Sequence, residues 1–245
     1  MKVDVLLVPA LLSPLRLAGC SVAVIDVLRA STVIVTALEN GAAGVVPVAD
    51  PDEAMQKAGE NAASGALTGG ERGGRKIKGF DLGNSPLEYG RDVVKNRTIF
   101  FTSTNGSQAV MKTRGVAADL CLAAILNARA VAQWILRKGR DAVLVCSGDD
   151  EAFSMEDALC AGLILQRLTV AAGQAKIQTT DSASACRILY GQAEHDLLDK
   201  IAETSHGRDL VRLGLADDIP FAARPDVSRV VPIYKDGVFI PEFII

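Results

Sequence analysis

Two acidic residues and two arginines stand where this chain could handle a phosphate group. Asp26 lies near the end of the apolar run 21–28, with Arg29 three residues later, and Glu71 precedes Arg72 in a glycine-rich stretch. Phosphate monoesters hydrolyse very slowly, so a catalyst needs positive charge at the phosphate, usually a metal, and an activated nucleophile. We interpret Asp26, Arg29 and Glu71 as the candidate catalytic residues.

The role of Asp26 has three interpretations. Haloacid-dehalogenase phosphatases carry a second aspartate two positions after the first as acid and base, but this chain has Leu28 there. Attack of Asp26 on phosphorus is therefore less favoured than a role as metal ligand or as the base that activates water. A purely structural pair with Arg29 is the third interpretation. Ser31 and Thr32 begin the next helical stretch and are predicted to bind the anionic substrate there.

Residues 69–86, GGERGGRKIKGFDLGNSP, combine six glycines with four cations and two acids. Glycine lets the backbone approach a ligand and adopt positive φ. We therefore predict that Gly69, Gly70, Gly73 and Gly74 wrap an anion with their N–H groups. The stretch is expected to be a mobile loop that closes over a polyanionic ligand, and a disordered surface loop is the alternative.

Charged and amide side chains of the same stretch are predicted to face the ligand. The carboxylate of Glu71 would point toward a metal, and the guanidinium of Arg72 would fork onto phosphate or a second acid group. Asp81 and Asn84 offer further oxygen ligands. Ser85 is predicted to cap a short helix that a proline begins.

Polar groups follow two further predicted strands. Thr104, Asn105 and Gly106 would present a hydroxyl and amides to the substrate at a helix start. Glu156 and Asp157 fall in the first turn of another helix, where the helix dipole favours acids in any case. One of the two, taken as Glu156, is predicted to bind the metal.

The predicted metal is Mg²⁺, held by Asp26, Asp81 and Glu156. Carboxylate oxygens without a cluster of His or Cys suit a hard cation. Of the two histidines in the chain, His206 lacks the Arg-His-Gly order of histidine phosphatases. Arg208 is therefore predicted to face the substrate in its place.

Short β-branched runs alternate with amphipathic helical stretches along the chain. Runs that are apolar on both faces, separated by helices, indicate a mostly parallel sheet with helices on both sides, a layered α/β/α fold. Two apolar runs within 230–244 surround a Lys-Asp-Gly turn and predict a C-terminal hairpin. We expect one unit over 1–245; if it has two lobes, their boundary falls at 125–140. The predicted strands are 3–9, 21–28, 44–49, 98–104, 118–124 and 141–148.

Composition limits the partners of the chain. Its 245 residues are 49% hydrophobic with a formal net charge of -3, so there is no global basic field for nucleic acid. No apolar run reaches membrane-spanning length, and Asp4 and Pro9 interrupt the apolar start, so a cytoplasmic protein is expected. The expected partner is a small anionic phosphorylated substrate, and the apolar content is compatible with a homodimer.

The five cysteines are odd in number and far apart, without a Cys-x-x-Cys pair. This pattern is typical of reduced, buried thiols. Cys146 ends an apolar run, but a cysteine phosphatase needs an arginine six positions later, where this chain has Ala152. A structural role is predicted for all five.

Several segments together resemble one known family, the 2-phosphosulfolactate phosphatases, a magnesium-dependent group associated with coenzyme M synthesis. They occur in this order through most of the chain, and the second is long and unusual. The matching segments are VIDVLRASTVIVTALENGA (24–42), GERGGRKIKGFDLGNSPLEY (70–89), TSTNGSQAV (102–110), FSMEDALCAG (153–162) and SHGRDLVRLGLADDI (205–219).

The resemblance implies an Mg²⁺-dependent hydrolase that converts 2-phosphosulfolactate into sulfolactate and phosphate. Two alternatives remain open at this point. One is a phosphatase of the same fold that acts on another small phosphorylated acid. The other is a non-catalytic binding protein for an anionic metabolite, which an assay for turnover would distinguish.

Overall fold

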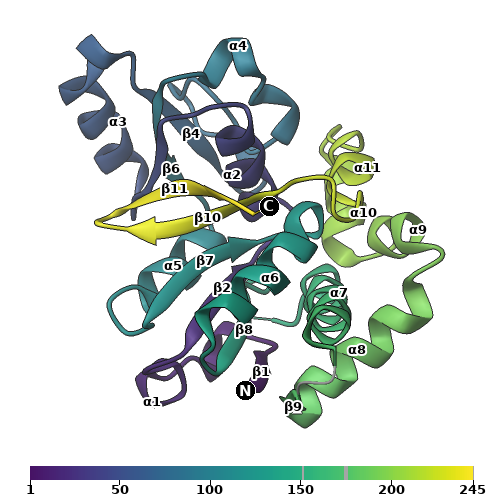
Figure 1. Ribbon diagram of the computed structural model, residues 1–245. Helices are drawn as coiled ribbons and strands as arrows, with labels where there is room; N and C mark the ends of the chain where they lie inside the picture. The colour runs from purple at the N-terminus through teal and green to yellow at the C-terminus, as the bar shows by residue number, and fades with distance from the viewer. Residues whose placement is uncertain (151, 174–175, 245) are drawn as a thin grey trace.

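The computed structural model describes residues 1–150, 152–173 and 176–244. These residues form an α/β fold with one mixed sheet, shown in Figure 1, as the sequence predicted. The strands are β1 (Lys2–Leu6), β2 (Ser21–Ile25), β3 (Gly44–Pro47), β4 (Leu67–Arg72), β5 (Arg75–Lys76), β6 (Thr98–Thr102), β7 (Asp119–Ala123), β8 (Ala142–Cys146), β9 (Gln178–Thr179), β10 (Val230–Lys235) and β11 (Val238–Phe243).

Helices follow most of the parallel strands. A helix after each strand is the connection that parallel pairing requires, since the chain must return to the starting edge of the sheet. The α-helices are α1 (Pro14–Leu17), α2 (Ala30–Glu39), α3 (Pro51–Glu60), α4 (Arg91–Val94), α5 (Gly106–Thr113), α6 (Ala128–Lys138), α7 (Met155–Ala172), α8 (Asp181–Ala193), α9 (Leu197–Ala202), α10 (Ser205–Arg212) and α11 (Asp218–Ala222); the 3-10 helices are η1 (Pro9–Leu11), η2 (Ala62–Ser64), η3 (Pro86–Glu88) and η4 (Ile125–Asn127).

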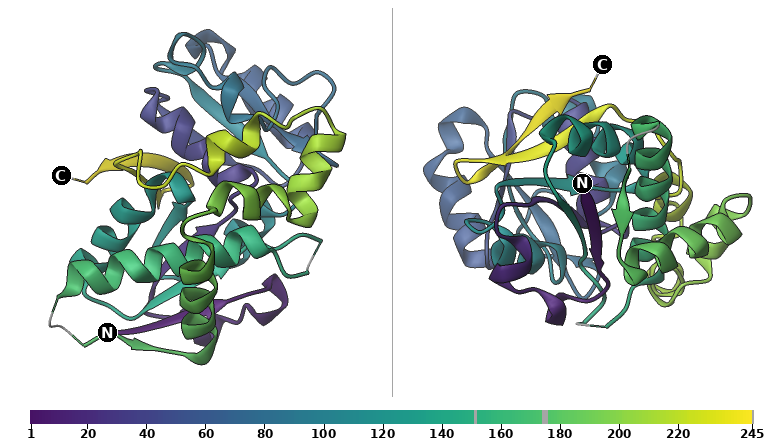
Figure 2. Two further views of the ribbon diagram at one scale, coloured as in Figure 1. Left: turned by 90° about the vertical axis from the view of Figure 1, so that its right-hand side faces the viewer. Right: turned by 60° about the horizontal axis from the view of Figure 1, so that its bottom comes forward.

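The predicted C-terminal hairpin is confirmed, and it lies in the middle of the sheet. The strand order is β5-β4-β6-β3-β11-β10-β7-β2-β8-β1-β9. The hairpin thus joins the parallel group β4-β6-β3 to the parallel group β7-β2-β8-β1-β9, and Figures 1 and 2 show it between them. Each junction is antiparallel and registers through one residue pair, Ile233 with Cys121 and Phe239 with Val45.

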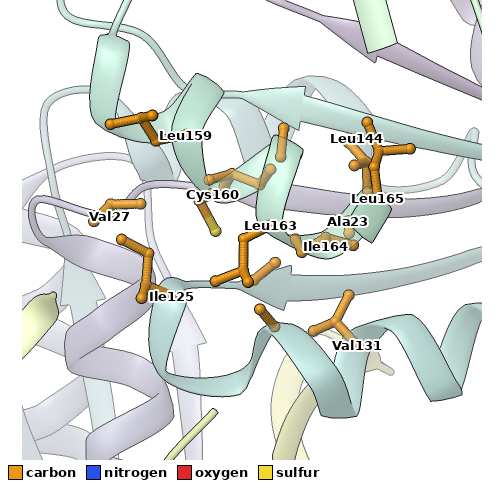
Figure 3. Close-up of a cluster of buried hydrophobic side chains, with 14 of the residues drawn as sticks. Ala23, Val27, Ile125, Val131, Leu144, Leu159, Cys160, Leu163, Ile164 and Leu165 are labelled. Atoms are coloured by element: carbon orange, nitrogen blue, oxygen red, sulfur yellow. The ribbon is translucent and has the colours of Figure 1, made fainter. Parts of the chain in front are cut away.

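Alternate residues of the parallel strands face two different helix layers. In β2, Val22 and Val24 join a core with α2 and α5, whereas Ala23 and Ile25 join a core with α6, α7 and α8. Figure 3 shows the second core, where Leu163 and its neighbours on α7 pack over the sheet. The layered α/β/α prediction therefore holds, because both faces of each central strand are apolar and covered.

The stretch predicted as a loop, residues 69–86, begins as an ordered hairpin. Strand β4 pairs with β5, and a two-residue turn at Gly73 and Gly74, with φ of +58° and +76°, connects them. Gly70 was predicted to contact an anion, but the structure gives a packing reason for glycine at this position. A Cβ there would lie 1.9 Å from the carbonyl oxygen of Thr102 on β6. Whether the hairpin moves stays a prediction.

The suggested lobe boundary at 125–140 falls on η4 and α6, which pack against the sheet. The division into lobes stays a prediction. Among the described residues, none of the helices combines the length and the apolar character needed to cross a bilayer.

Gly70→Ala should lower the free energy of unfolding by about 3 kcal/mol, since the new methyl group collides with backbone at a position with positive φ. The matched control is Gly59→Ala, within α3, where a Cβ meets nothing within 4 Å. That change should raise the free energy of unfolding by about 1 kcal/mol through helix propensity. Chemical denaturation measures both, and a Gly70→Ala protein as stable as wild type would contradict the packing argument.

Candidate active site

A cavity of about 230 Å³ opens at the carboxyl ends of strands from both parallel groups. Asp26 follows β2, Asp149 follows β8, Ser103 follows β6, and Glu71 lies near the end of β4. Ligands of parallel α/β sheets bind at these ends, where helix N-termini also point. The cavity is lined by Asp26, Leu28, Arg29, Glu71, Gly73, Gly74, Asn84, Ser103, Thr104, Asn105, Asp149, Asp150, His206, Asp209 and Leu213.

Asp26 is almost fully buried at the cavity wall. One carboxylate oxygen accepts a hydrogen bond from the N–H of Ala30, 3.1 Å away at the start of α2. Burial raises the pKa of Asp26 from 3.8 to about 6; the positive charge of His206 opposes the rise, and the negative charges of Glu71 and Glu156 add to it. At neutral pH Asp26 is therefore mostly ionised, but at a free-energy cost that an added cation would relieve.

Gly106 lies directly against Asp26, although it does not line the cavity itself. A Cβ at this position would come within 2.5 Å of Oδ2 of Asp26. The first residue of α5 must therefore be glycine for the buried carboxylate to keep its place. Gly106 was predicted to bind the substrate, whereas the structure gives it a steric role beside Asp26.

Glu71 ties two backbone segments of the cavity together. One of its oxygens accepts a hydrogen bond from the N–H of Thr104 at 2.7 Å, and the other accepts from the N–H of Gly74 at 2.8 Å. The carboxylate is only 6% exposed. It therefore fixes the β4-β5 turn against the end of β6, and the N–H of Gly74, which was predicted to hold an anion, is bonded to it.

Arg29 forms a buried ion pair with a residue far along the chain. Its Nη1 donates to Oδ2 of Asp218 at 2.7 Å, and each side chain is 2% exposed. Its Nη2 donates to the carbonyl oxygen of Gly74 at 2.7 Å. The interpretation of Arg29 as a structural partner of Asp26 is not what the structure shows, since the ion pair is with Asp218.

His206 and Glu156 form a second contact between a cation and an acid beside the cavity. Nδ1 of His206 lies 3.5 Å from Oε1 of Glu156, which is 3% exposed. Burial alone would lower the pKa of His206, but the contact with Glu156 and the charges of Glu156, Asp26 and Asp149 outweigh it and raise the pKa above 6.5. His206 therefore keeps its positive charge to a higher pH than an ordinary histidine, within the lining of the cavity.

Asp157 braces the ends of two central strands. Its two oxygens accept hydrogen bonds from the N–H groups of Val27 at 2.9 Å and of Gly148 at 3.2 Å. Burial raises its pKa well above the usual value, and the charges of Asp26 and Glu156 add to the increase. Three buried acids therefore lie close enough to influence one another.

Three cavity-lining residues carry a buried polar atom without a hydrogen-bond partner in the described part of the chain. These atoms are Nε of Arg29, Oδ1 of Asn84 and Oγ1 of Thr104. An unpaired buried polar atom costs about 1–3 kcal/mol, so three around one cavity indicate a site that a polar ligand completes.

Several residues predicted for the site lie elsewhere. The Asp81 carboxylate is at the surface and accepts hydrogen bonds from the N–H and hydroxyl of Thr68, both at 2.8 Å, so it does not join Asp26 and Glu156. Arg72 is exposed, and its guanidinium binds Thr102 and two backbone carbonyls. Among the described residues, no group of three His, Cys, Asp or Glu side chains is placed to hold a metal.

Hydroxyls and cations at the helix starts also differ from the prediction. Ser31 and Thr32 are buried and donate to carbonyl oxygens of the preceding strand and turn, Val24 and Val27. Arg208 is exposed and donates to the carbonyl oxygen of Glu203; it does not line the cavity but lines an adjoining hollow that shares Asp149 and His206 with it. The predicted cap is confirmed: Ser85 accepts a hydrogen bond from the N–H of Leu87 at the start of η3.

Sequence reasoning missed four charged groups of the cavity: Asp149, Asp150, His206 and Asp209. The first two follow an apolar strand, which was a usable signal, because acids at a buried strand end face the same edge as Asp26. His206 and Asp209 sit on α10, whose placement over the cavity depends on long-range packing and leaves no local signal.

The fold and the cavity place the chain among α/β proteins that bind a small charged ligand at the carboxyl ends of parallel strands. The sequence profile of 2-phosphosulpholactate phosphatases matches residues 6–237. A protein of Symbiobacterium thermophilum described as a probable 2-phosphosulfolactate phosphatase is 42% identical over 222 residues, which cover 91% of this chain and 94% of that protein. This chain belongs to the 2-phosphosulfolactate phosphatase family, as the resemblance predicted.

Two further relatives carry the same description. The protein of Thermotoga maritima is 41% identical over 239 residues, covering 97% of each chain. The protein of Clostridium acetobutylicum is 36% identical over 237 residues, covering 97% of this chain and 99% of the relative. The similarity therefore includes every segment that lines the cavity.

Without added cation, the protein should lose stability as the pH rises from about 4 to above 6.5, first through Asp26 and then through His206. The folded-state pKa of Asp26, about 6, lies above its ordinary 3.8, so its contribution to stability is present below 3.8 and is lost as pH rises through 6. His206 acts in the same direction, because its pKa is raised above 6.5. Chemical denaturation in chelator across this range should show a flatter slope for Asp26→Asn, and parallel slopes would contradict the assignment.

Proposed function

We propose that this protein is a phosphoric monoester hydrolase that converts 2-phosphosulfolactate into sulfolactate and phosphate with the help of Mg²⁺. The observation that carries the proposal is the cavity where Asp26, Glu71 and Arg29 meet, in a chain of this family. The named substrate carries a phosphate, a sulfonate and a carboxylate. A cavity of about 230 Å³ with charged walls suits a ligand of that size and polarity.

The charge of the cavity supports a role for a cation. Five acids line it, Asp26, Glu71, Asp149, Asp150 and Asp209, against one arginine and one histidine. A polyanionic substrate would be repelled from such walls unless positive charge were added. The raised pKa of Asp26 has the same origin, since burial and neighbouring acids penalise its charge.

Mg²⁺ fits the donor set. The cavity offers carboxylate, amide and hydroxyl oxygens, including the unpartnered Oδ1 of Asn84 and Oγ1 of Thr104. Mg²⁺ usually binds proteins through one or two carboxylates and completes its shell with water and substrate phosphate. Asp26 and Glu71 would hold it here. When bound, it would neutralise the phosphate charge and polarise the phosphorus–oxygen bond.

The protein groups then have distinct roles. Nε of Arg29, buried and without a protein partner, donates to a phosphate oxygen. Asp26, ionised at neutral pH, accepts a proton from the water that attacks phosphorus. His206 supplies a proton to the ester oxygen as it leaves, because its pKa is raised and it lines the same cavity. We favour direct attack by water, since Leu28 stands where the aspartyl-phosphate route has an acid.

A phosphatase for a different small phosphorylated acid would use the same groups at the phosphate. It would differ in the residues that recognise the rest of the substrate.

We further propose that the protein acts in the cytoplasm, which agrees with five free cysteines. A homodimer stays a prediction.

A panel of phosphorylated two- and three-carbon acids, assayed for released phosphate, tests the function. The sulfonated substrate should give the highest kcat/KM, and chelator should abolish turnover until Mg²⁺ is restored. Mg²⁺ alone should also raise the melting temperature more at pH 7.5 than at pH 5.5, because Asp26 is more fully ionised at the higher pH. No turnover on any member of the panel would favour the non-catalytic binding protein.

Asp26→Asn should lower kcat by about 100-fold or more, since an amide neither accepts the proton nor carries the charge. A single turnover in ¹⁸O-labelled water distinguishes the two mechanisms. Direct attack leaves the label in released phosphate only, whereas an aspartyl-phosphate puts label into the Asp26 carboxylate. Near-normal turnover of the variant would remove Asp26 from the mechanism.

A further inference from the structure

Asp218 has contacts that the proposed reaction does not yet use. It begins α11, is 1% exposed, and its Oδ2 pairs with Nη1 of Arg29 at 2.7 Å. Its other oxygen, Oδ1, accepts a hydrogen bond from the hydroxyl of Ser85 at 2.5 Å. Both oxygens are thus engaged, so the position of this carboxylate is fixed by a second segment of the chain.

The guanidinium of Arg29 is held from two sides. Asp218 accepts a hydrogen bond from Nη1, and the carbonyl oxygen of Gly74 accepts one from Nη2. Nε is buried without a partner in the described part of the chain. A planar guanidinium bonded at two of its nitrogens cannot rotate, so its remaining edge has a set orientation. Arg29 also lines the cavity.

A purely structural pair is a poor explanation for this arrangement. Taking two charges out of water costs several kcal/mol per ion, and a well-packed apolar pair often gives equal or greater stability. The buried charges and the unpaired Nε of Arg29 are explained if the ion pair orients Arg29 to bind an anionic ligand.

We infer that Asp218 is a positioning residue that, with Ser85, holds Arg29 in the orientation that binds the phosphate group. The inference rests on the proposed function for its choice of phosphate as ligand. It assigns a role in the site to η3 and α11, two elements outside the strand ends. Asp218 itself need not touch the substrate, because it acts through the guanidinium.

The test is the affinity for inorganic phosphate, measured by calorimetry on folded protein with Mg²⁺ present. Asp218→Asn should weaken binding roughly tenfold or more, since Arg29 loses the charge that orients it. Ser85→Ala keeps the ion pair and should weaken phosphate binding by a smaller factor. If Asp218→Asn does not fold, Ser85→Ala is the variant that tests the inference. Unchanged affinity in the folded variants would overturn the inference.

Two controls separate positioning from stability. Asp226→Asn removes another buried partner of an arginine, Arg167 at 2.7 Å, outside the cavity, so it should lower stability and leave phosphate affinity unchanged. In an Arg29→Gln background, Asp218→Asn should weaken phosphate binding no further, because its effect passes through Arg29. A further loss in that background, or equal losses in the Asp226 control, would overturn the inference.

The phosphate measurement also distinguishes this inference from the proposed function. A wild-type protein that binds phosphate but releases none from any substrate would overturn the proposed hydrolase activity. The phosphate affinities of the variants would still decide the role of Asp218. A wild-type protein that turns over substrate while Arg29→Gln binds phosphate normally would overturn the inference alone.

Discussion

The buried contact between Arg29 and Asp218 connects the segment after β2 with α11, and the same guanidinium bonds to the β4-β5 turn. Arg29 follows β2 in one parallel group, Gly74 belongs to the β4-β5 turn of the other group, and Asp218 begins α11. One guanidinium therefore fixes the relative position of both strand groups at the cavity. Because the pair excludes water, its strength is little affected by salt, unlike that of a surface ion pair.

The acids around Asp26 have the opposite effect on stability. Asp26, Glu156 and Asp157 are each less than a tenth exposed, and the pKa values of Asp26 and Asp157 are raised by burial and by the negative charges of neighbouring acids. Such crowding lowers the stability of the cation-free protein. Strained electrostatics of this kind are typical of sites that bind or transform a ligand, because the ligand relieves them.

Much of the fold follows from local patterns in the sequence. The apolar runs of six parallel strands, the cap at Ser85 and the turn between β10 and β11 were predictable, since each depends on neighbouring residues, whereas β4 and β9 were not predicted. Asp26 was found because it lies near the end of an apolar run, and Glu71 because it lies among glycines and cations that suit an anion. The central place of the hairpin was not predictable, because it depends on which distant strands accept it.

The differences between the predicted and the observed placement of site residues have a common cause, which is side-chain direction. Glu71 and Asp81 occur in the same charged stretch, yet the tight turn sends the first into the cavity and leaves the second at the surface beside Thr68. On α10, His206 lines the cavity whereas Arg208, two residues later, is exposed. Residues two apart on a helix point to different sides, and composition alone does not tell which side is covered.

The hairpin in the middle of the sheet has a consequence for how the chain folds. Strands β10 and β11 come after the other nine in chain order, yet among the described residues they alone pair one strand group with the other. The β7-β2-β8-β1-β9 group already pairs distant residues, such as Ser21 with Asp119, and the joining step adds the pair of Phe239 with Val45, which spans most of the chain. The cavity, which draws walls from both groups, should therefore be among the last parts to assemble.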